Sequence, residues 1–167
     1  MSERIPWFDR KFSFGLAPEM LSVLLERLDG TVLRLEHKVK GASDKLLSEK
    51  FDGKWSVKQN IGHLAEVDQV NSRRIDEILQ GVKIMSPAVF EPQDYNPWPV
   101  ARVIAFFNDT RQSNIRKYAA LSAAEKKMAS IHPRLKVKMN PVDLAFFDAE
   151  HDDHHLLTIS DIIRAHQ

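Results

Sequence analysis

Hydrophobic residues recur along most of the chain at steps of three and four positions, the spacing that places them on one face of an α-helix. Four long stretches show this pattern, and they predict helices at residues 18–40, 57–80, 100–120 and 141–165. Capping signals support two of the starts. Ser56 with Gln59 is a capping box before the second helix, and Asn140 with Pro141 suits the beginning of the fourth. The sequence therefore predicts an all-α protein.

Amphipathic helices of this length bury their apolar faces against one another, so we expect a four-helix bundle that forms a single domain over residues 1–167. Four prolines interrupt residues 81–99, the connection between the second and third helices. Fully extended, this connection reaches roughly 55–60 Å, whereas a 24-residue helix is only about 36 Å long. The second and third helices can therefore run parallel, which predicts a bundle with a long crossover connection.

Three shorter segments lie outside the long helices. Residues 1–16 contain Trp7, Phe8 and Phe12 without a helical period, and we expect them to form an irregular arm over the bundle. Residues 43–48 predict a short helical turn. Residues 130–139 are predicted to be irregular.

Charge and cysteine content narrow the classes of function. Lys and Arg number 24 against 23 for Asp and Glu, so no global field attracts nucleic acid or an anionic membrane. The chain has no cysteine, which excludes disulfides, thiolate ligands and a cysteine nucleophile. No stretch of eighteen apolar residues and no signal peptide is apparent. We expect a soluble cytoplasmic protein that acts through a site on a small molecule.

The fourth predicted helix carries two histidines where core residues are expected. Its apolar stripe follows steps of three and four through Leu144, Phe147, His151, His155, Ile159 and Ile162. His151 and His155 therefore share one face. A buried imidazole is costly unless its nitrogens find partners, and a divalent metal satisfies two or three imidazoles at once. The alternative is a core histidine pair hydrogen-bonded to neighbours or water.

A third histidine, His63, lies on the second predicted helix, on the same flank as Val67 and Val70. Three neutral imidazoles on one ion leave coordination positions for water or substrate, as in a catalytic site. Helix geometry allows the three residues to meet but does not require it. Taken alone, His63 is more typical of a structural histidine.

Two motifs are similar to those of a known family. Residues 52–58 followed by Gly62-His63-Leu64 look like the family's start of helix two, and residues 150–156 look like its His-x-x-x-His helix. His132-Pro133, ahead of the last helix, is also similar. On these residues the chain resembles the DinB/YfiT-like metalloenzymes over nearly its whole length.

The resemblance implies an up-down-down-up four-helix bundle, often a homodimer, with a divalent metal held by His63, His151 and His155. Zinc and nickel are the ions it favours. Relatives include metal-dependent hydrolases and thiol-dependent S-transferases, so the implied partners are a small-molecule substrate and a low-molecular-weight thiol. The alternative is a non-catalytic bundle that acts through protein association, with a structural or vacant metal site.

Four carboxylates are candidates for orienting a ligand histidine or moving protons: Glu66, Asp68, Asp152 and Asp153. Helical geometry places Asp68 nearest the core, which makes it the candidate catalytic residue. Asp152 and Asp153 are expected to face solvent. His154 should point away from the site because one residue turns a side chain by about 100° around a helix.

Overall fold

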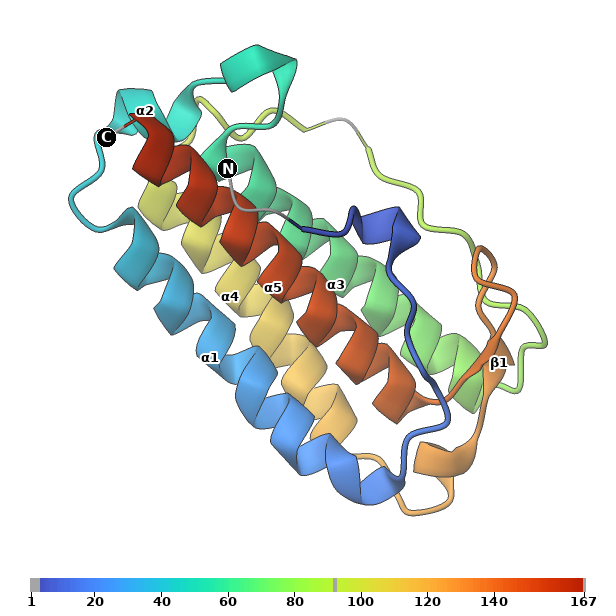
Figure 1. Cartoon of the computed structure of the whole chain (residues 1–167). Helices are drawn as coiled ribbons and strands as arrows, with labels where there is room; N and C mark the ends of the chain where they lie inside the picture. Colours follow the sequence, from blue (N-terminus) through green and yellow to red (C-terminus); the bar gives the residue numbers. More distant parts are fainter. Residues whose placement is uncertain (1–3, 92, 167) are drawn as a thin grey trace.

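Four long helices lie side by side in the computed structural model, which describes residues 4–91 and 93–166 (Figure 1). The long helices are α1 (Leu21–Val39), α3 (Val57–Leu79), α4 (Val100–Ala119) and α5 (Pro141–His166). The predicted all-α four-helix fold is confirmed, and each helix boundary lies within three residues of its prediction. The first turn of the first predicted helix is instead a 3-10 turn, η2 (Pro18–Met20).

Each long helix packs against two others. Helices α1 and α3 both contact α4 and α5, so the four surround one core. In Figure 1, α3 and α4 run in one direction and α1 and α5 in the other, and the connection from α3 to α4 returns along the length of the bundle. None of the helices that the structure describes is both long enough and apolar enough to cross a membrane.

The remaining elements are short. They are η1 (Trp7–Asp9), α2 (Asp44–Ser48), η3 (Phe51–Gly53), η4 (Glu125–Lys127), β1 (Ser130–Ile131) and β2 (Lys138–Met139). Helix α2 forms at the predicted helical turn. The prediction for residues 130–139 was wrong, because β1 and β2 pair there as an antiparallel hairpin. Strands of two residues are too short to show an alternating pattern in the sequence.

Side-chain hydrogen bonds define where α3 and α5 begin. At α3, the hydroxyl of Ser56 accepts from the backbone N–H of Gln59, and the Gln59 side chain accepts from the N–H of Ser56, both at 3.1 Å. At α5, Asp143 completes a similar box with Asn140. The second function of Asp143 is to hold the N-terminal arm, since its Oδ1 accepts from the backbone N–H of Gly15 at 2.8 Å.

A polar layer crosses the middle of the bundle between two apolar clusters. One cluster contains Leu35, Ile61, Phe107 and Leu156, and the other contains Leu28, Ile75, Tyr118 and Leu144. The polar layer is centred on Arg111 of α4, which is fully buried. Its guanidinium donates to Asp152 at 2.6 Å and to Asp68 at 3.1 Å. Each of the four long helices contributes to the layer, because Thr31 of α1 also donates to Asp152.

The expectation that Asp152 faces solvent was wrong. Its side chain is fully buried, because the buried face of α5 is wider than the predicted stripe. It includes Leu144, His155 and Ile159 of that stripe and also Ala149, Asp152 and Leu156 beside it. Burial alone would lower the pKa of Arg111, but the charges of Asp152 and Asp68 outweigh burial and raise that pKa well above its ordinary value. Arg111 therefore stays charged and compensates the buried carboxylates.

Candidate metal centre

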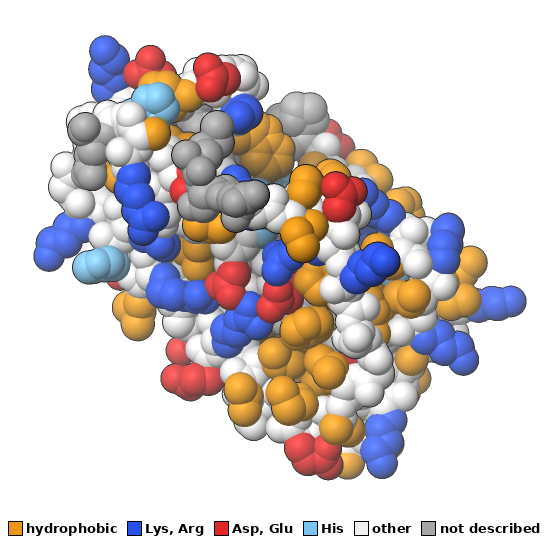
Figure 2. Space-filling view, viewed as in Figure 1, with side chains coloured by type: hydrophobic (Ala, Val, Ile, Leu, Met, Phe, Trp, Pro, Cys, Tyr) orange, Lys and Arg blue, Asp and Glu red, His pale blue; other side chains and the backbone are white. Residues whose placement is uncertain are grey.

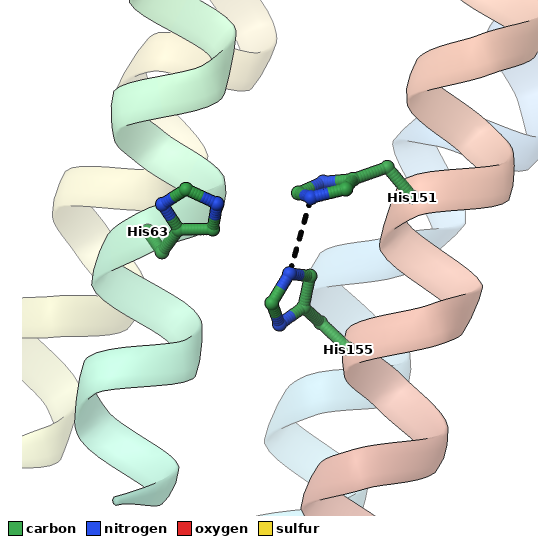
Figure 3. A group of neighbouring side chains, drawn as sticks. All are labelled: His63, His151 and His155. Carbon is green, nitrogen blue, oxygen red and sulfur yellow. Dashed lines mark hydrogen bonds between the residues drawn. The ribbon is translucent and has the colours of Figure 1, made fainter. Parts of the chain in front are cut away.

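The three predicted histidines lie together between α3 and α5. His63 projects from α3 toward His151 and His155, which extend from successive turns of α5 (Figure 3). One ring nitrogen from each histidine lies within 4.8 Å of the other two. The inference from helix spacing left this meeting open, and the structure brings the three side chains to one place.

The spacing of the α5 pair suits ligands of one ion. The Nε2 atoms of His151 and His155 are 3.1 Å apart. Two nitrogens at about 2.0–2.1 Å from a shared ion, with ligand angles of about 90–110°, lie roughly 2.9–3.4 Å from each other. The same contact can be a hydrogen bond between two neutral rings, which is the alternative interpretation of this pair.

Neighbouring oxygens orient two of the rings. Nδ1 of His155 lies 2.7 Å from Oδ1 of Asn60, and the Asn60 amide nitrogen donates to the carbonyl of Ser56 at 2.8 Å. The Asn60 oxygen is therefore the acceptor, so the His155 proton sits on Nδ1 and the Nε2 lone pair is left for a ligand. Nδ1 of His63 likewise lies 3.3 Å from Oε2 of Glu66.

Burial keeps the α5 histidines in the form that binds metal. Desolvation, reinforced by the neighbouring His63, lowers the pKa of His151 to about 3. The pKa of His155 is also well below its ordinary value, for the same main reason. Both imidazoles are therefore neutral at physiological pH, and a neutral ring nitrogen offers the lone pair that a metal needs.

A cavity of about 840 Å³ opens beside the histidines. Trp7 and Phe12 of the N-terminal arm form part of its wall, together with Phe147 of α5. The Trp7 ring lies 5.1 Å from that of His151 and 5.2 Å from that of Phe147. The arm predicted as an irregular cover is thus one wall of the candidate site, and its aromatic rings reduce the access of water to the histidines.

His154 lies outside the group of three nitrogens. The prediction that it points away from the site was wrong in one respect, because its side chain lines the same cavity. Its ring lies 5.6 Å from Trp7.

The candidate carboxylates are in different places. Asp68 lies in the polar layer, hydrogen-bonded to Arg111, and none of its hydrogen bonds within residues 4–91 and 93–166 reaches an imidazole. Its role in proton transfer stays a prediction. Asp153 is partly exposed and pairs with Arg34 at 2.7 Å and with Arg27. Charged side chains of both signs gather there, across the middle of the face in Figure 2.

Sequence reasoning missed Asn60, and it listed Glu66 without giving it priority. A signal was present, because polar residues follow one flank of α3 at steps of three and four. That flank contains Asn60, His63, Asn71 and Arg74, with Val67 as its one apolar member, and all five line the cavity. A stripe of polar residues beside an apolar seam indicates that the helix borders a site.

The sequence matches the DinB superfamily over residues 14–159. The fold is similar to that of YfiT from Bacillus subtilis, with a TM-score of 0.80 and 18% identity over 93% of each chain. YfiT is described as a probable metal-dependent hydrolase with an unusual four-helix bundle topology. No curated protein matches the sequence. At this identity the likeness to YfiT shows the fold alone.

Proposed function

Because the chain belongs to the DinB superfamily, we propose that it is a metal-dependent hydrolase in which His63, His151 and His155 hold one divalent ion, zinc or nickel. The observation that carries this proposal is the convergence of three imidazoles, one nitrogen of each within 4.8 Å of the others, at the wall of a large cavity. The description of YfiT as a probable metal-dependent hydrolase favours the same class of reaction.

A divalent ion bound by three neutral nitrogens supplies Lewis-acid activation of a water molecule or a thiol. The protein's own residues position and shield the site. Asn60 and Glu66 hold the Nδ1 protons of His155 and His63, so that both rings present Nε2. Tyr95 donates to Glu66 at 2.8 Å and keeps that carboxylate in place. Trp7 covers His151 from the arm.

Thiol-dependent transfer is the second candidate reaction. The cavity volume of about 840 Å³ lies in the upper range of small-molecule sites and leaves room for a thiol beside a second substrate. A hydrolase needs only water as its second reactant. Turnover that requires an added low-molecular-weight thiol would therefore identify a transferase.

The test compares His151→Ala with His154→Ala, since both residues line the cavity but only His151 belongs to the group of three. Protein purified without a metal-affinity column is analysed for bound elements and assayed for ester and amide hydrolysis, with and without thiol. We expect one divalent ion per chain and turnover in wild type and His154→Ala, and neither in His151→Ala. Equal turnover by wild type and His151→Ala would overturn the proposal.

Bound metal without turnover on any substrate would favour the alternative of a non-catalytic bundle. The homodimer that the family resemblance implies also stays a prediction, and sedimentation of the same preparations tests it.

A further inference from the structure

A buried arginine lines the cavity far from the histidines. Arg74 lies on α3 eleven residues after His63, which corresponds to about 16 Å along the helix. Only 6% of Arg74 is exposed. Its Nε and Nη2 atoms each approach the carbonyl of Ser86 at 3.4 Å, the outer limit of a hydrogen bond. These contacts use one edge of the guanidinium.

The other edge of the Arg74 guanidinium is unused. Within residues 4–91 and 93–166, no hydrogen bond involves Nη1, and no carboxylate lies within 4.0 Å of the side chain. Burial is the main reason that the pKa of Arg74 is lowered, but the group remains a cation near neutral pH. A buried cation without an ion pair is costly, so a bound anion would stabilise it.

The charges of Glu77 and Asp148 favour the cationic form of Arg74, but neither carboxylate forms an ion pair with it within the described residues. The carboxylate of Glu77 accepts from the backbone N–H of Ser86 at 2.8 Å and from the Ser86 hydroxyl. Asp148 also lines the cavity, where burial raises its pKa well above the ordinary value and Asn71 is a hydrogen-bonding neighbour. Its closest cation is Arg111, at 3.8 Å.

His132 supplies a second donor at this end of the cavity. Its Nδ1 accepts from the backbone N–H groups of Arg134 and Leu135 at 3.3 and 3.1 Å. The neutral ring must therefore carry its proton on Nε2. Within the described residues Nε2–H has no acceptor, and the side chain lines the cavity.

The walls between the two ends are mostly apolar, with Asn71 and Asp148 as polar members. Val67 and Val70 of α3 face the cavity, opposite Phe147 of α5 and Phe12 of the arm. A ligand that reaches from Arg74 to the histidines must therefore have an apolar body. The ligand class that fits the cavity therefore has a charged group at one end and an apolar body.

We propose that the cavity binds an elongated, mostly apolar carboxylate, whose anionic end is held by Arg74 and His132 and whose other end lies at the three histidines. The free Nη1–Nη2 edge matches a carboxylate, which accepts two parallel hydrogen bonds from a guanidinium. The placement of the ligand's other end at the three histidines rests on the proposed function. The carboxylate site at Arg74 and His132 does not depend on that function.

The test measures binding of octanoate and of octanamide, its neutral counterpart of the same shape. Trp7 and Trp55 line the cavity, so their fluorescence reports occupancy, and calorimetry gives the affinity. For wild type we expect octanoate to bind at least tenfold more tightly than octanamide. Equal affinity of the wild-type protein for octanoate and octanamide would by itself overturn the inference. Tighter Arg74-dependent binding of octyl phosphate would also overturn it, because the site would then select phosphate.

Arg74→Gln removes the charge, and Arg73→Gln is the matched control because Arg73 lies next in the helix but is largely exposed. We expect the preference for octanoate to fall to about twofold or less in Arg74→Gln and to persist in Arg73→Gln. Arg74→Lys keeps a cation and should keep part of the preference if Arg74→Gln does not fold. A folded Arg74→Gln protein with an undiminished preference would refute the assignment.

Including His151→Ala separates this inference from the proposed function. Octanoate binding that depends on His151 and not on Arg74 would place the carboxylate at the histidines, and only the inference would fail. Arg74-dependent selectivity in a protein that binds no metal would leave the inference standing while the proposed function fails.

Discussion

The Oδ1 atom of Asn60 on α3 lies 2.7 Å from Nδ1 of His155 on α5, so an amide on one helix selects the tautomer of a histidine on another. The contact is buried, and it leaves the Nε2 lone pair of His155 facing His151. Oxygen partners of this kind strengthen metal binding because they orient the ring and raise its basicity.

We therefore expect Asn60→Ala to weaken zinc binding by about 10- to 100-fold. Asn60→Asp retains an oxygen acceptor for the Nδ1 proton and should bind zinc with nearly wild-type affinity. Competition with a chromogenic chelator at pH 7 measures both affinities, and circular dichroism checks that both variants fold. Wild-type affinity in a folded Asn60→Ala protein would show that the contact does not support the metal.

A second prediction concerns Gly62, which precedes His63. A Cβ atom at Gly62 would lie 2.2 Å from the buried ring of Tyr95, so Gly62→Ala must displace that ring. We expect a net loss of about 1–3 kcal/mol in unfolding free energy, measured by urea denaturation. Zinc affinity should fall as well, because Tyr95 holds Glu66 and Glu66 contacts His63.

The control for this substitution is Gly30→Ala in α1, where no atom lies within 4 Å of the added Cβ. This change should raise the unfolding free energy by about 0.5–1 kcal/mol, since alanine is the better helix former. A stabilised Gly62→Ala protein would mean that Tyr95 moves without cost.

The polar layer gives a prediction about stability. Arg111→Met leaves the buried carboxylates of Asp68, Asp148 and Asp152 without their cation, and removal of one partner from a buried charge network costs about 3–5 kcal/mol. Urea denaturation should show a loss of this size. Arg116→Met, at an exposed position of the same helix, should change the unfolding free energy by no more than about 0.5 kcal/mol. Similar small effects in both variants would contradict the role assigned to Arg111.

His132 should make stability depend on pH. Burial, with help from the charges of Arg74 and Arg134, lowers its pKa from 6.5 to about 4 in the folded protein. As the pH falls below about 6.5, the unfolded chain binds a proton at this residue and the folded chain does not. The contribution of His132 to the unfolding free energy is therefore complete above pH 6.5 and is lost progressively down to about pH 4.

The loss in unfolding free energy from His132 should be on the order of 3 kcal/mol. His132→Asn places an oxygen acceptor near the position of Nδ1 and cannot titrate, so its unfolding free energy should fall less steeply between pH 6.5 and 4. Urea denaturation at several pH values measures both slopes. Identical slopes for wild type and His132→Asn would rule out this source of pH dependence.

The sequence predicts the helices well because their signals are local. The capping box of Ser56 and Gln59 is complete within four residues, and the apolar stripes need only neighbouring turns of the helix. The spacing of His151 and His155 is local in the same way, which is why their shared face could be inferred. Helix geometry allowed His63 to join the pair without requiring it, and the family resemblance supported the group of three.

Features that depend on distant partners could not be predicted in this way. Asp152 is buried because Arg111, forty-one positions away on another helix, compensates its charge. Asn60 has a role only because His155 packs against it across the bundle. Nothing in the sequence sets Arg74 apart from other helical arginines, because its surroundings come from the loop at Ser86 and from the hairpin residue His132.

The candidate metal centre draws its histidines from α3 and α5, and α5 follows all the other helices in the chain. During synthesis from the N-terminus, a ribosome that has completed α1, α3 and α4 has produced only one of the three imidazoles. The arm that carries Trp7 is made first, yet its anchors Asp143 and Glu150 are on the last helix. Assembly of the three histidines and closure of the cavity are thus late events in the life of the nascent chain, after α5 has docked.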